Sequence, residues 1–348
     1  MKRLINLIPS LLVPCGILLA DNPTLLDDRP YDEQFINSEH PEPPPFELPW
    51  LTGPLLTPNA HAIPFGHMNI EPYFYANTAY GKYDYHWRSH SVPHNFYNYN
   101  VAIPTQIGFA PRMDIQVVPQ FSYNHTHGTS PSPSSASDWV WNDMPIALDL
   151  QIVYDDQKNW YPAVKLSFLA NIPFGKYRHL NPKKLGTDVG GSGSWLPGFS
   201  VNMSRLIHFK GTHFLATRWF GAYVIPNSVI VSDFNAYGGG FGTRGTVYPG
   251  ATISAGFGLE YTLSQTWALA FDALYSHSNK TRFKGNAGTT DGVPNSIGGP
   301  SSEHFSIAPA IEYNWSENYG VIAGAWFSLA GRNASEFANG VIALNIYK

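Results

Sequence analysis

Apolar and polar residues alternate along much of the chain from residue 67 onward, in segments of roughly ten residues. In one of these segments Met113, Ile115 and Val117 fall on one face, while Asp114 and Gln116 fall on the other. A period of two is typical of a β-strand whose two faces meet different surroundings. The pattern is clearest in three segments: 112–123, 143–154 and 247–261.

Extending this pattern over the chain predicts about twelve strands joined by connections that alternate between short turns and longer loops. An even number of strands returns both ends of a barrel to the same side, the periplasm. The predicted fold class is therefore all-β, an antiparallel transmembrane β-barrel of about 12 strands in the outer membrane. The predicted strands are 68–80, 95–109, 112–124, 143–155, 160–172, 195–208, 213–225, 246–262, 265–277, 303–314, 317–328 and 337–347.

A soluble β-sandwich would also show alternation, but the composition argues against it. Only 13% of the residues are charged, about half the ~25% of a soluble domain, whereas 43% are hydrophobic and 15% aromatic. Aromatic residues such as Phe109, Trp160 and Trp267 stand at strand ends, as in the two interfacial girdles of a membrane barrel. No run of eighteen apolar residues follows residue 66, so no spanning helix is predicted.

The first twenty residues resemble a secretory signal peptide. Met1-Lys2-Arg3 is basic, the following stretch is apolar, and Ala20 provides a small residue before a cleavage site. The single cysteine, Cys15, lies in this segment, which excludes a disulfide framework in the rest of the chain. The predicted domains are a signal peptide, 1–20, an extension, 21–66, and the barrel, 67–348.

The extension is acidic and rich in proline. It carries eight acidic residues against one basic residue, Arg29, and ten of the 29 prolines. This composition favours an extended, disordered periplasmic segment. A second interpretation is a plug that folds into the pore, because apolar residues could anchor it: Phe46, Leu48, Trp50, Leu51, Leu55 and Leu56.

Several short motifs resemble the outer-membrane barrel family labelled after the meta-pathway of phenol degradation, in which a strand ends in a Pro-x-Gly turn before a Leu-Gly-Thr-Asp-like loop. The resemblance implies an outer-membrane channel or transporter-like barrel over 66–348, with no catalytic residues. The chain departs from the usual pattern of such barrels by ending on Lys348 rather than on an aromatic residue. The motifs are Asp143–Tyr154, Pro162–Leu169, Asn171–Tyr177, Leu185–Asp188 and Gly198–Ser200.

Charged residues on the polar face of the predicted strands should point into the lumen, because a Lys or Arg facing lipid at mid-depth costs roughly 2–4 kcal/mol. Six acids and two bases would make this lumen negative. Two interpretations stay open: a salt-bridge network that fills a narrow barrel, or a lining that prefers cations. The predicted lumen-lining residues are Glu71, Asp114, Asp149, Lys165, Arg218, Glu260, Asp272 and Glu312. Arg205 falls on the predicted lipid-facing side, near a short turn, where its head group could reach the interface.

No other candidate chemistry is favoured. The histidines His86, His90 and His94, and the pair His125 and His127, are expected in loops without the fixed geometry of a metal site. The glycine-rich stretch 237–242 lacks the Gly-Lys-Ser/Thr of a phosphate loop, and it is expected to be a pliable external loop. The net charge of −4 excludes a strongly basic nucleic-acid binder.

The sequence therefore predicts a channel for the passive passage of small solutes, either cation-preferring or for small aromatic compounds. We expect no enzyme activity and no cofactor. The expected partners are outer-membrane lipids, the barrel assembly machinery and small solutes, and the oligomeric state stays open. The alternatives are an outer-membrane hydrolase and a closed structural or adhesive barrel.

Overall fold

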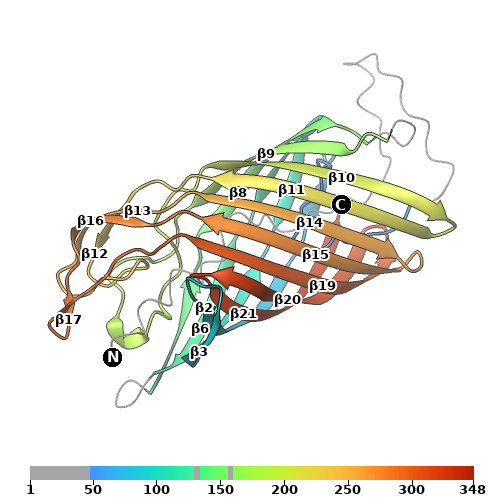
Figure 1. Cartoon of the computed structure of the whole chain (residues 1–348). Helices are drawn as coiled ribbons and strands as arrows, with labels where there is room; N and C mark the ends of the chain where they lie inside the picture. Colours follow the sequence, from blue (N-terminus) through green and yellow to red (C-terminus); the bar gives the residue numbers. More distant parts are fainter. Residues whose placement is uncertain (1–47, 129–133, 156–159) are drawn as a thin grey trace.

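The computed structural model describes residues 48–128, 134–155 and 160–348, and in these the chain is a closed antiparallel β-barrel (Figure 1). The sheet closes where β21 (Ser335–Tyr347) pairs with both β1 (Met68–Ile70) and β2 (Tyr73–Tyr83). The predicted signal peptide and residues 21–47 lie outside the described residues. No helix in the described part of the chain is long and apolar enough to cross a membrane.

The barrel has twelve strands, as the sequence predicted. The first four are each broken into two halves. The halves are β1 and β2, β3 (Ser89–Ala102) and β4 (Thr105–Ala110), β5 (Met113–Val117) and β6 (Gln120–His127), and β7 (Ser135–Trp141) and β8 (Met144–Val153). The other eight are β9 (Ala163–Ile172), β10 (Gly198–Lys210), β11 (His213–Val224), β14 (Thr252–Thr262), β15 (Trp267–Ser278), β19 (Ser302–Ser316), β20 (Tyr319–Arg332) and β21.

Prolines account for the broken strands, because proline has no N–H to donate to a neighbouring strand. Pro72, Pro104 and Pro119 lie in the first three breaks, and Pro145 follows the fourth. The breaks are aligned across the sheet. The N–H of Glu71 donates to the carbonyl of Pro104 at 2.9 Å. The N–H groups of Ile103 and Val118 likewise donate to the carbonyls of Pro119 and Pro145, at 3.0 and 2.9 Å.

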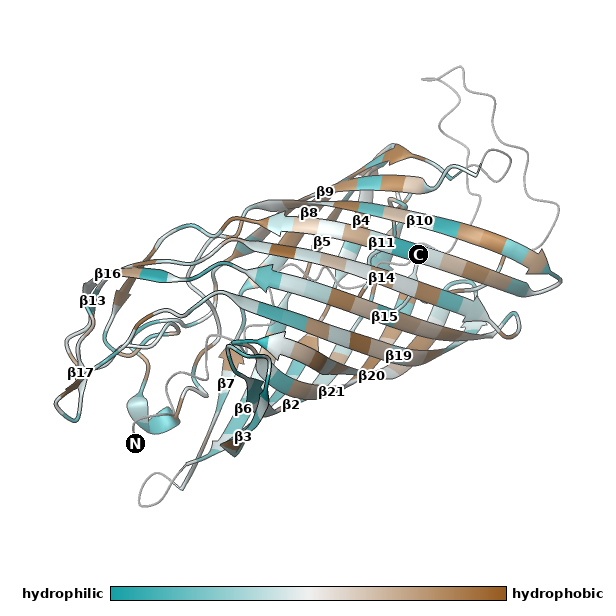
Figure 2. Ribbon diagram, viewed as in Figure 1, coloured by the Kyte–Doolittle hydropathy of each residue, from teal (hydrophilic) through white to brown (hydrophobic). Residues whose placement is uncertain are grey.

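The wall follows the predicted alternation, and hydrophobic and hydrophilic residues are interspersed along its strands (Figure 2). In β8, Leu148 and Ile152 are exposed on the outside, whereas Ala147, Asp149 and Gln151 are buried inside. A closed wall with this apolar exterior needs lipid around it, which places the chain in the outer membrane. The aromatic residues at the strand ends are exposed on this outer surface, among them Phe109, Trp160, Trp267 and Phe305.

Arg205 lies near the short-turn end of the barrel, on β10. Its Nη1 donates to the carbonyl of Tyr161 at 2.8 Å, and its guanidinium lies 5.2 Å from the ring centre of Trp160. The head group therefore sits among interfacial groups.

At the C-terminus, Ile342 and Leu344 face outward, while Tyr347 is buried and stacks on His67 at 5.5 Å.

Some sequence predictions were wrong at the loop end of the barrel. Segment 247–261 is interrupted: Val247 belongs to β13 (Arg244–Tyr248), outside the barrel wall, and β14 begins only at Thr252. A Cβ on Gly250, in the break, would overlap the backbone of Asn279. The loops expected over 226–245 and 278–302 contain a further sheet and a hairpin. Their strands are β12 (Val229–Ser232), β13, β16 (Arg282–Asn286), β17 (Thr289–Thr290) and β18 (Val293–Pro294).

Candidate functional site

Residues 48–66 lie inside the barrel and trace a U-shaped path, which we call the lumenal segment. The segment enters at the end with short turns, reaches its apex near Thr57 and returns to the same end before β1. Most of it is buried, from Leu51 to Ile63. These residues belong to the predicted extension 21–66, whose bounds stay a prediction because residues 21–47 lie outside the described part of the chain. The segment can lie inside because the wall supplies acceptors for its backbone.

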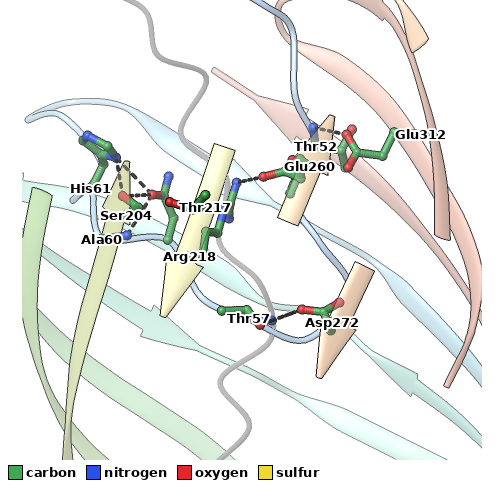
Figure 3. Close-up of polar contacts among 12 residues, drawn as sticks. Thr52, Thr57, Ala60, His61, Ser204, Thr217, Arg218, Glu260, Asp272 and Glu312 are labelled. Atoms are coloured by element: carbon green, nitrogen blue, oxygen red, sulfur yellow. Dashed lines mark hydrogen bonds and ion pairs between the residues drawn. The ribbon is translucent and has the colours of Figure 1, made fainter. Parts of the chain in front are cut away.

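The entering arm is bound by side chains of the barrel wall. Gln265 Nε2 donates to the carbonyl of Leu48, and Asn314 Nδ2 donates to the carbonyl of Trp50, at 2.9 and 3.1 Å. Further in, the Thr52 N–H donates to Glu312 Oε2 at 2.9 Å, as Figure 3 shows. These contacts satisfy backbone groups that would otherwise be buried without partners.

Gly53, on the entering arm, lies against two charged groups of the wall. Its N–H donates to Glu260 Oε1 at 2.9 Å. Its φ of 95° is in the left-handed region, and a Cβ here would lie 3.0 Å from Arg218 Nη1. Glycine therefore allows the segment to lie directly against the Arg218 guanidinium.

The apex is fixed by one carboxylate. The backbone N–H and the hydroxyl of Thr57 donate to Asp272 Oδ1 at 3.0 and 2.6 Å (Figure 3). On the neighbouring strand, at the position that pairs with Asp272, a Cβ on Gly258 would lie only 2.9 Å from both Pro54 Cγ and Thr57 Cβ. The apex thus packs directly on the backbone of β14.

Leu55 and Leu56, also at the apex, are fully buried in an apolar cluster formed by inward side chains of the wall. The cluster includes Leu169, Phe220, Leu274 and other buried apolar residues from many strands: Tyr73, Tyr75, Val118, Leu196, Val224, Ile322, Trp326 and Val341. The interior is therefore not a uniformly polar channel. Apolar surface, rather than water-exposed charge, surrounds the apex of the lumenal segment.

The returning arm is bound at three further positions. Ser204 and His61 both contact Asn59 Oδ1, at 3.1 and 3.0 Å (Figure 3). The Ala62 N–H donates to Gln151 Oε1, and the Ile63 N–H donates to Asp114 Oδ2, at 3.0 and 2.9 Å.

Gly108 marks the contact between the end of this arm and the wall. A Cβ on Gly108 would lie 2.0 Å from the carbonyl oxygen of Pro64 and 2.5 Å from that of Ile63. Both are backbone atoms and cannot rotate away. The returning arm therefore needs glycine at this position of β4.

The eight charged residues predicted to line the lumen are all buried within the barrel. Asp114, Glu260, Asp272 and Glu312 accept backbone hydrogen bonds from the lumenal segment. Arg218 pairs with Glu260 at 2.7 Å, and Lys165 pairs with Asp149 at 2.8 Å. Glu71 accepts from Asn69 Nδ2 and the hydroxyl of Tyr73, at 2.9 and 3.2 Å, apart from the segment.

This arrangement brings Arg218, Glu260, Asp272 and Glu312 together around the entering arm and the apex, and Asp114 with the returning arm. Sequence reasoning missed the neutral contacts of the segment, from Asn59, Gln151, Ser204 and Asn314. For Gln151, Ser204 and Asn314 the only available signal was their place in predicted strands, which they share with many other polar residues, and Asn59, in the predicted extension, had no such signal.

His61, Ser204 and Asp155 raise the question of a hydrolase, because a Ser, a His and an acid meet here. His61 Nε2 lies 3.3 Å from Asp155 Oδ1, and its Nδ1 lies 3.4 Å from Ser204 Oγ. The Ser204 hydroxyl, however, donates to Asn59 Oδ1, and His61 Nδ1 faces the same oxygen at 3.0 Å. The Ser204 hydroxyl is therefore directed to Asn59 rather than to His61, and Ser204 and Asp155 contact the returning arm at Asn59 and His61.

A second element, the loop 173–197, folds over the open end of the lumen. Asp143, in the break between β7 and β8, accepts from the N–H of Gly175 and of Ser192 at 2.9 and 2.7 Å. Asn124, buried on the inward face of β6, donates to the carbonyl of Thr187 at 2.9 Å. The predicted Leu-Gly-Thr-Asp motif therefore lies in this inner loop, directly after the 3₁₀ helix η3 (Pro182–Lys184).

The glycine-rich stretch packs into the same loop cluster rather than forming a pliable loop. Gly238 and Gly239 are buried, with φ values of 108° and 95°. The hydroxyl of Tyr237 donates to the carbonyl of Ser192 at 2.9 Å, and burial raises the pKa of this tyrosine.

The histidine clusters were misplaced. His125 and His127 are in β6, and His90 and His94 are in β3, because both strands extend further than the pattern indicated. Among the described residues, no group of three or more His, Cys, Asp or Glu could hold a metal ion.

Comparison with solved structures shows what the fold resembles. An outer membrane channel from Pseudomonas putida F1 aligns over 83% of this chain and 98% of its own, with a TM-score of 0.63 and 11% sequence identity. The chain has the fold of an outer-membrane channel. This is the fold that the family resemblance implied.

Weaker likenesses include the transport unit of the autotransporter AIDA-I from Escherichia coli, with a TM-score of 0.45, 10% identity and coverage of 81% and 90% of the two chains. The NanC porin aligns with a TM-score of 0.40 and 10% identity, over 78% and 98%. No protein-family profile and no curated protein sequence matches the chain.

Proposed function

We propose that this protein is an outer-membrane channel for the passive passage of small solutes, and that its lumenal segment sets the width of the passage. The observation that carries the proposal is the set of backbone hydrogen bonds from this segment to Asp114, Glu260, Asp272 and Glu312 of the wall. These contacts hold the segment in the space through which a solute would have to pass.

Small aromatic or apolar solutes suit this interior better than hydrated cations. The acids that could attract cations already have partners. Four of them accept hydrogen bonds from the lumenal segment, and Glu260 among these also pairs with Arg218. Asp149 pairs with Lys165, and Glu71 accepts from Asn69 and Tyr73. The apolar cluster around Leu55 and Leu56 instead offers surface on which a ring can be desolvated at low cost. We therefore expect weak ion selectivity.

The test is transport by the refolded full chain. In planar bilayers we expect a small conductance and a reversal potential near zero under a salt gradient. In liposomes we expect phenol to enter faster than a hydrophilic solute of similar size, after subtraction of protein-free leakage. A large, strongly cation-selective conductance would contradict the proposal.

The apolar cluster provides a matched pair of variants. Leu274→Gln places an amide among buried apolar side chains, while Leu274→Met keeps their apolar character and approximate volume. Phenol entry should fall several-fold in Leu274→Gln and change little in Leu274→Met. Equal rates in both variants would exclude this cluster from the solute path.

The closed structural barrel is the second candidate, because the apex of the segment and the apolar cluster fill much of the interior. It predicts neither conductance nor solute entry in the same experiments. The hydrolase alternative predicts ester hydrolysis that Ser204→Ala abolishes, which the hydrogen bonding of Ser204 to Asn59 does not support.

A further inference from the structure

Beyond the barrel wall, the three-stranded sheet β12–β13–β16 has one buried face and one exposed face. Strands β13 and β16 project past the ends of β14 and β15 at the loop end of the molecule (Figure 1). On the buried face, Val229, Val231 and Val247 pack against Tyr237. Tyr177 and Val189, from the loop over the lumen, complete this packing. The exposed face therefore points away from the mouth of the barrel.

Three cations share that exposed face. In the register of β13 and β16, Thr246 lies opposite Lys284, Tyr248 opposite Arg282, and Arg244 opposite Asn286. Because side chains alternate across a strand, Arg244, Arg282 and Lys284 project to the same side of the sheet. Arg282 and Lys284 are two residues apart on β16, and Arg244 is the diagonal neighbour of Lys284 on β13. All three are exposed, and within the described part of the chain none of them forms an ion pair.

No acid belongs to this face. Asp233, which follows β12, is directed to His179, with Oδ2 at 3.3 Å from the imidazole Nδ1. The cations are instead accompanied by the exposed side chains of Tyr248 and Ile230. A cluster of positive charge beside an aromatic ring and an aliphatic group offers contacts to both phosphate groups and sugar rings.

The position of the face selects among anionic partners. Tyr275 and Phe305, in contact at 4.7 Å, belong to the aromatic residues at the loop end of the wall, where the apolar belt ends. Arg282 follows Tyr275 by seven residues, and at about 3.3 Å per residue the chain between them spans at most roughly 23 Å. Because β13 and β16 project past the end of the wall, as Figure 1 shows, the cations can reach the height that a phosphorylated oligosaccharide would occupy.

We propose that Arg244, Arg282 and Lys284 bind phosphate groups on the sugar chain of a glycolipid in the outer leaflet, that is, lipopolysaccharide. The opposite face of the same sheet packs on the loop cluster, so the bound glycolipid would stand beside that cluster. This inference depends on the outer-membrane location and not on the proposed channel activity.

The test uses the purified full chain in nanodiscs and lipopolysaccharide with a phosphorylated core as the probe. The triple variant Arg244→Gln, Arg282→Gln, Lys284→Gln should bind at least tenfold more weakly than the natural chain, with a smaller salt dependence. The matched control, Arg88→Gln, Lys183→Gln, Lys210→Gln, removes three exposed cations that do not share a face. It should bind as the natural chain does.

Two further probes distinguish the source of the phosphate. Dephosphorylated lipopolysaccharide should lose the difference between the natural chain and the triple variant, and phosphatidylglycerol nanodiscs should show no such difference. Equal weakening by the control triple, unchanged binding by the site triple, or a difference that survives dephosphorylation would each overturn the proposal. Folding is checked by heat-dependent gel mobility. If the triple variant does not fold, Arg282→Gln and Lys284→Gln are measured singly, and each should weaken binding severalfold.

Discussion

Thr57 donates two hydrogen bonds to one oxygen of Asp272, from its backbone N–H at 3.0 Å and from its hydroxyl at 2.6 Å. The two residues are 215 positions apart in the sequence. This contact joins the apex of the lumenal segment to the middle of β15. Because the two hydrogen bonds can be removed one at a time or together, the attachment of the apex to the wall can be weakened gradually by substitution.

Thr57→Val removes the hydroxyl bond and keeps the backbone bond, which should cost about 1 kcal/mol. Asp272→Leu removes both acceptor contacts and leaves a buried N–H without this partner, at about 1–3 kcal/mol or more. A change of 1 kcal/mol is about fivefold in an equilibrium constant. The fraction of time spent in a wider conducting state should therefore rise about fivefold in Thr57→Val, and by more than that in Asp272→Leu. Single-channel recordings measure this fraction of time. A larger increase in Thr57→Val than in Asp272→Leu would contradict the role of Asp272.

Gly108→Ala should displace the returning arm, because its Cβ would lie 2.0 Å from the carbonyl oxygen of Pro64. We expect a larger conductance without loss of the barrel. Gly221→Ala is the matched control on the outer face, since a Cβ there would meet no atom within 4 Å. The account fails here if both variants conduct alike.

Arg218→Met leaves Glu260 buried without its cationic partner, and loss of one partner of a buried pair costs about 3–5 kcal/mol. The double variant Arg218→Met, Glu260→Gln should recover part of this loss, because the uncompensated charge is gone. The measurement is the urea midpoint of unfolding, followed by gel mobility. A double variant less stable than Arg218→Met alone would show that the pair is not the source of the effect.

The turn after β2 should respond to acid. The hydrogen bond from His90, at 2.9 Å, and that from the Arg88 N–H, at 3.0 Å, lower the pKa of Asp84 to about 2 from an ordinary 3.8. A lowered pKa means that Asp84 stabilises the turn above pH 3.8, and this contribution is lost as the pH falls through about 2. The loss of the turn can be followed by the fluorescence of Trp87, which lies in the same turn. Its signal is obtained at each pH by subtracting the fluorescence of Trp87→Phe from that of the natural chain. A change confined to pH values above 5 would implicate a group other than Asp84.

The sequence predicted the barrel and its inward charges because alternation is local: Asp114 and Gln116 stand between Ile115 and its apolar neighbours, whatever the rest of the chain does. The path of the lumenal segment was not predictable in this way. Thr57 and Asp272 are joined by a contact far apart in sequence, and the backbone N–H that Asp272 accepts is the same in every residue but proline. The sheet β12–β13–β16 was missed because its strands are only four or five residues long.

A reversible tether at the apex tests most directly whether the lumenal segment controls passage through the barrel. Thr57 Cβ lies 2.9 Å from a Cβ built on Gly258, which is shorter than the roughly 3.5–4.5 Å of a disulfide, and a small shift of the apex away from β14 reaches that distance. We therefore expect Thr57→Cys with Gly258→Cys, in a Cys15→Ser background, to form a disulfide between the apex and β14. Each single cysteine variant serves as a control.

The decisive measurement is the single-channel conductance of this double variant before and after reduction in the bilayer. We expect a low conductance while the disulfide holds the apex to β14, and a higher conductance after reduction with dithiothreitol. Once the disulfide is reduced, the apex is held less tightly, because the Thr57 hydroxyl bond to Asp272 is missing and the side chain at position 258 crowds the apex. Reoxidation should restore the low value, and neither single variant should respond. A conductance that is the same in the oxidised and reduced states would contradict the claim.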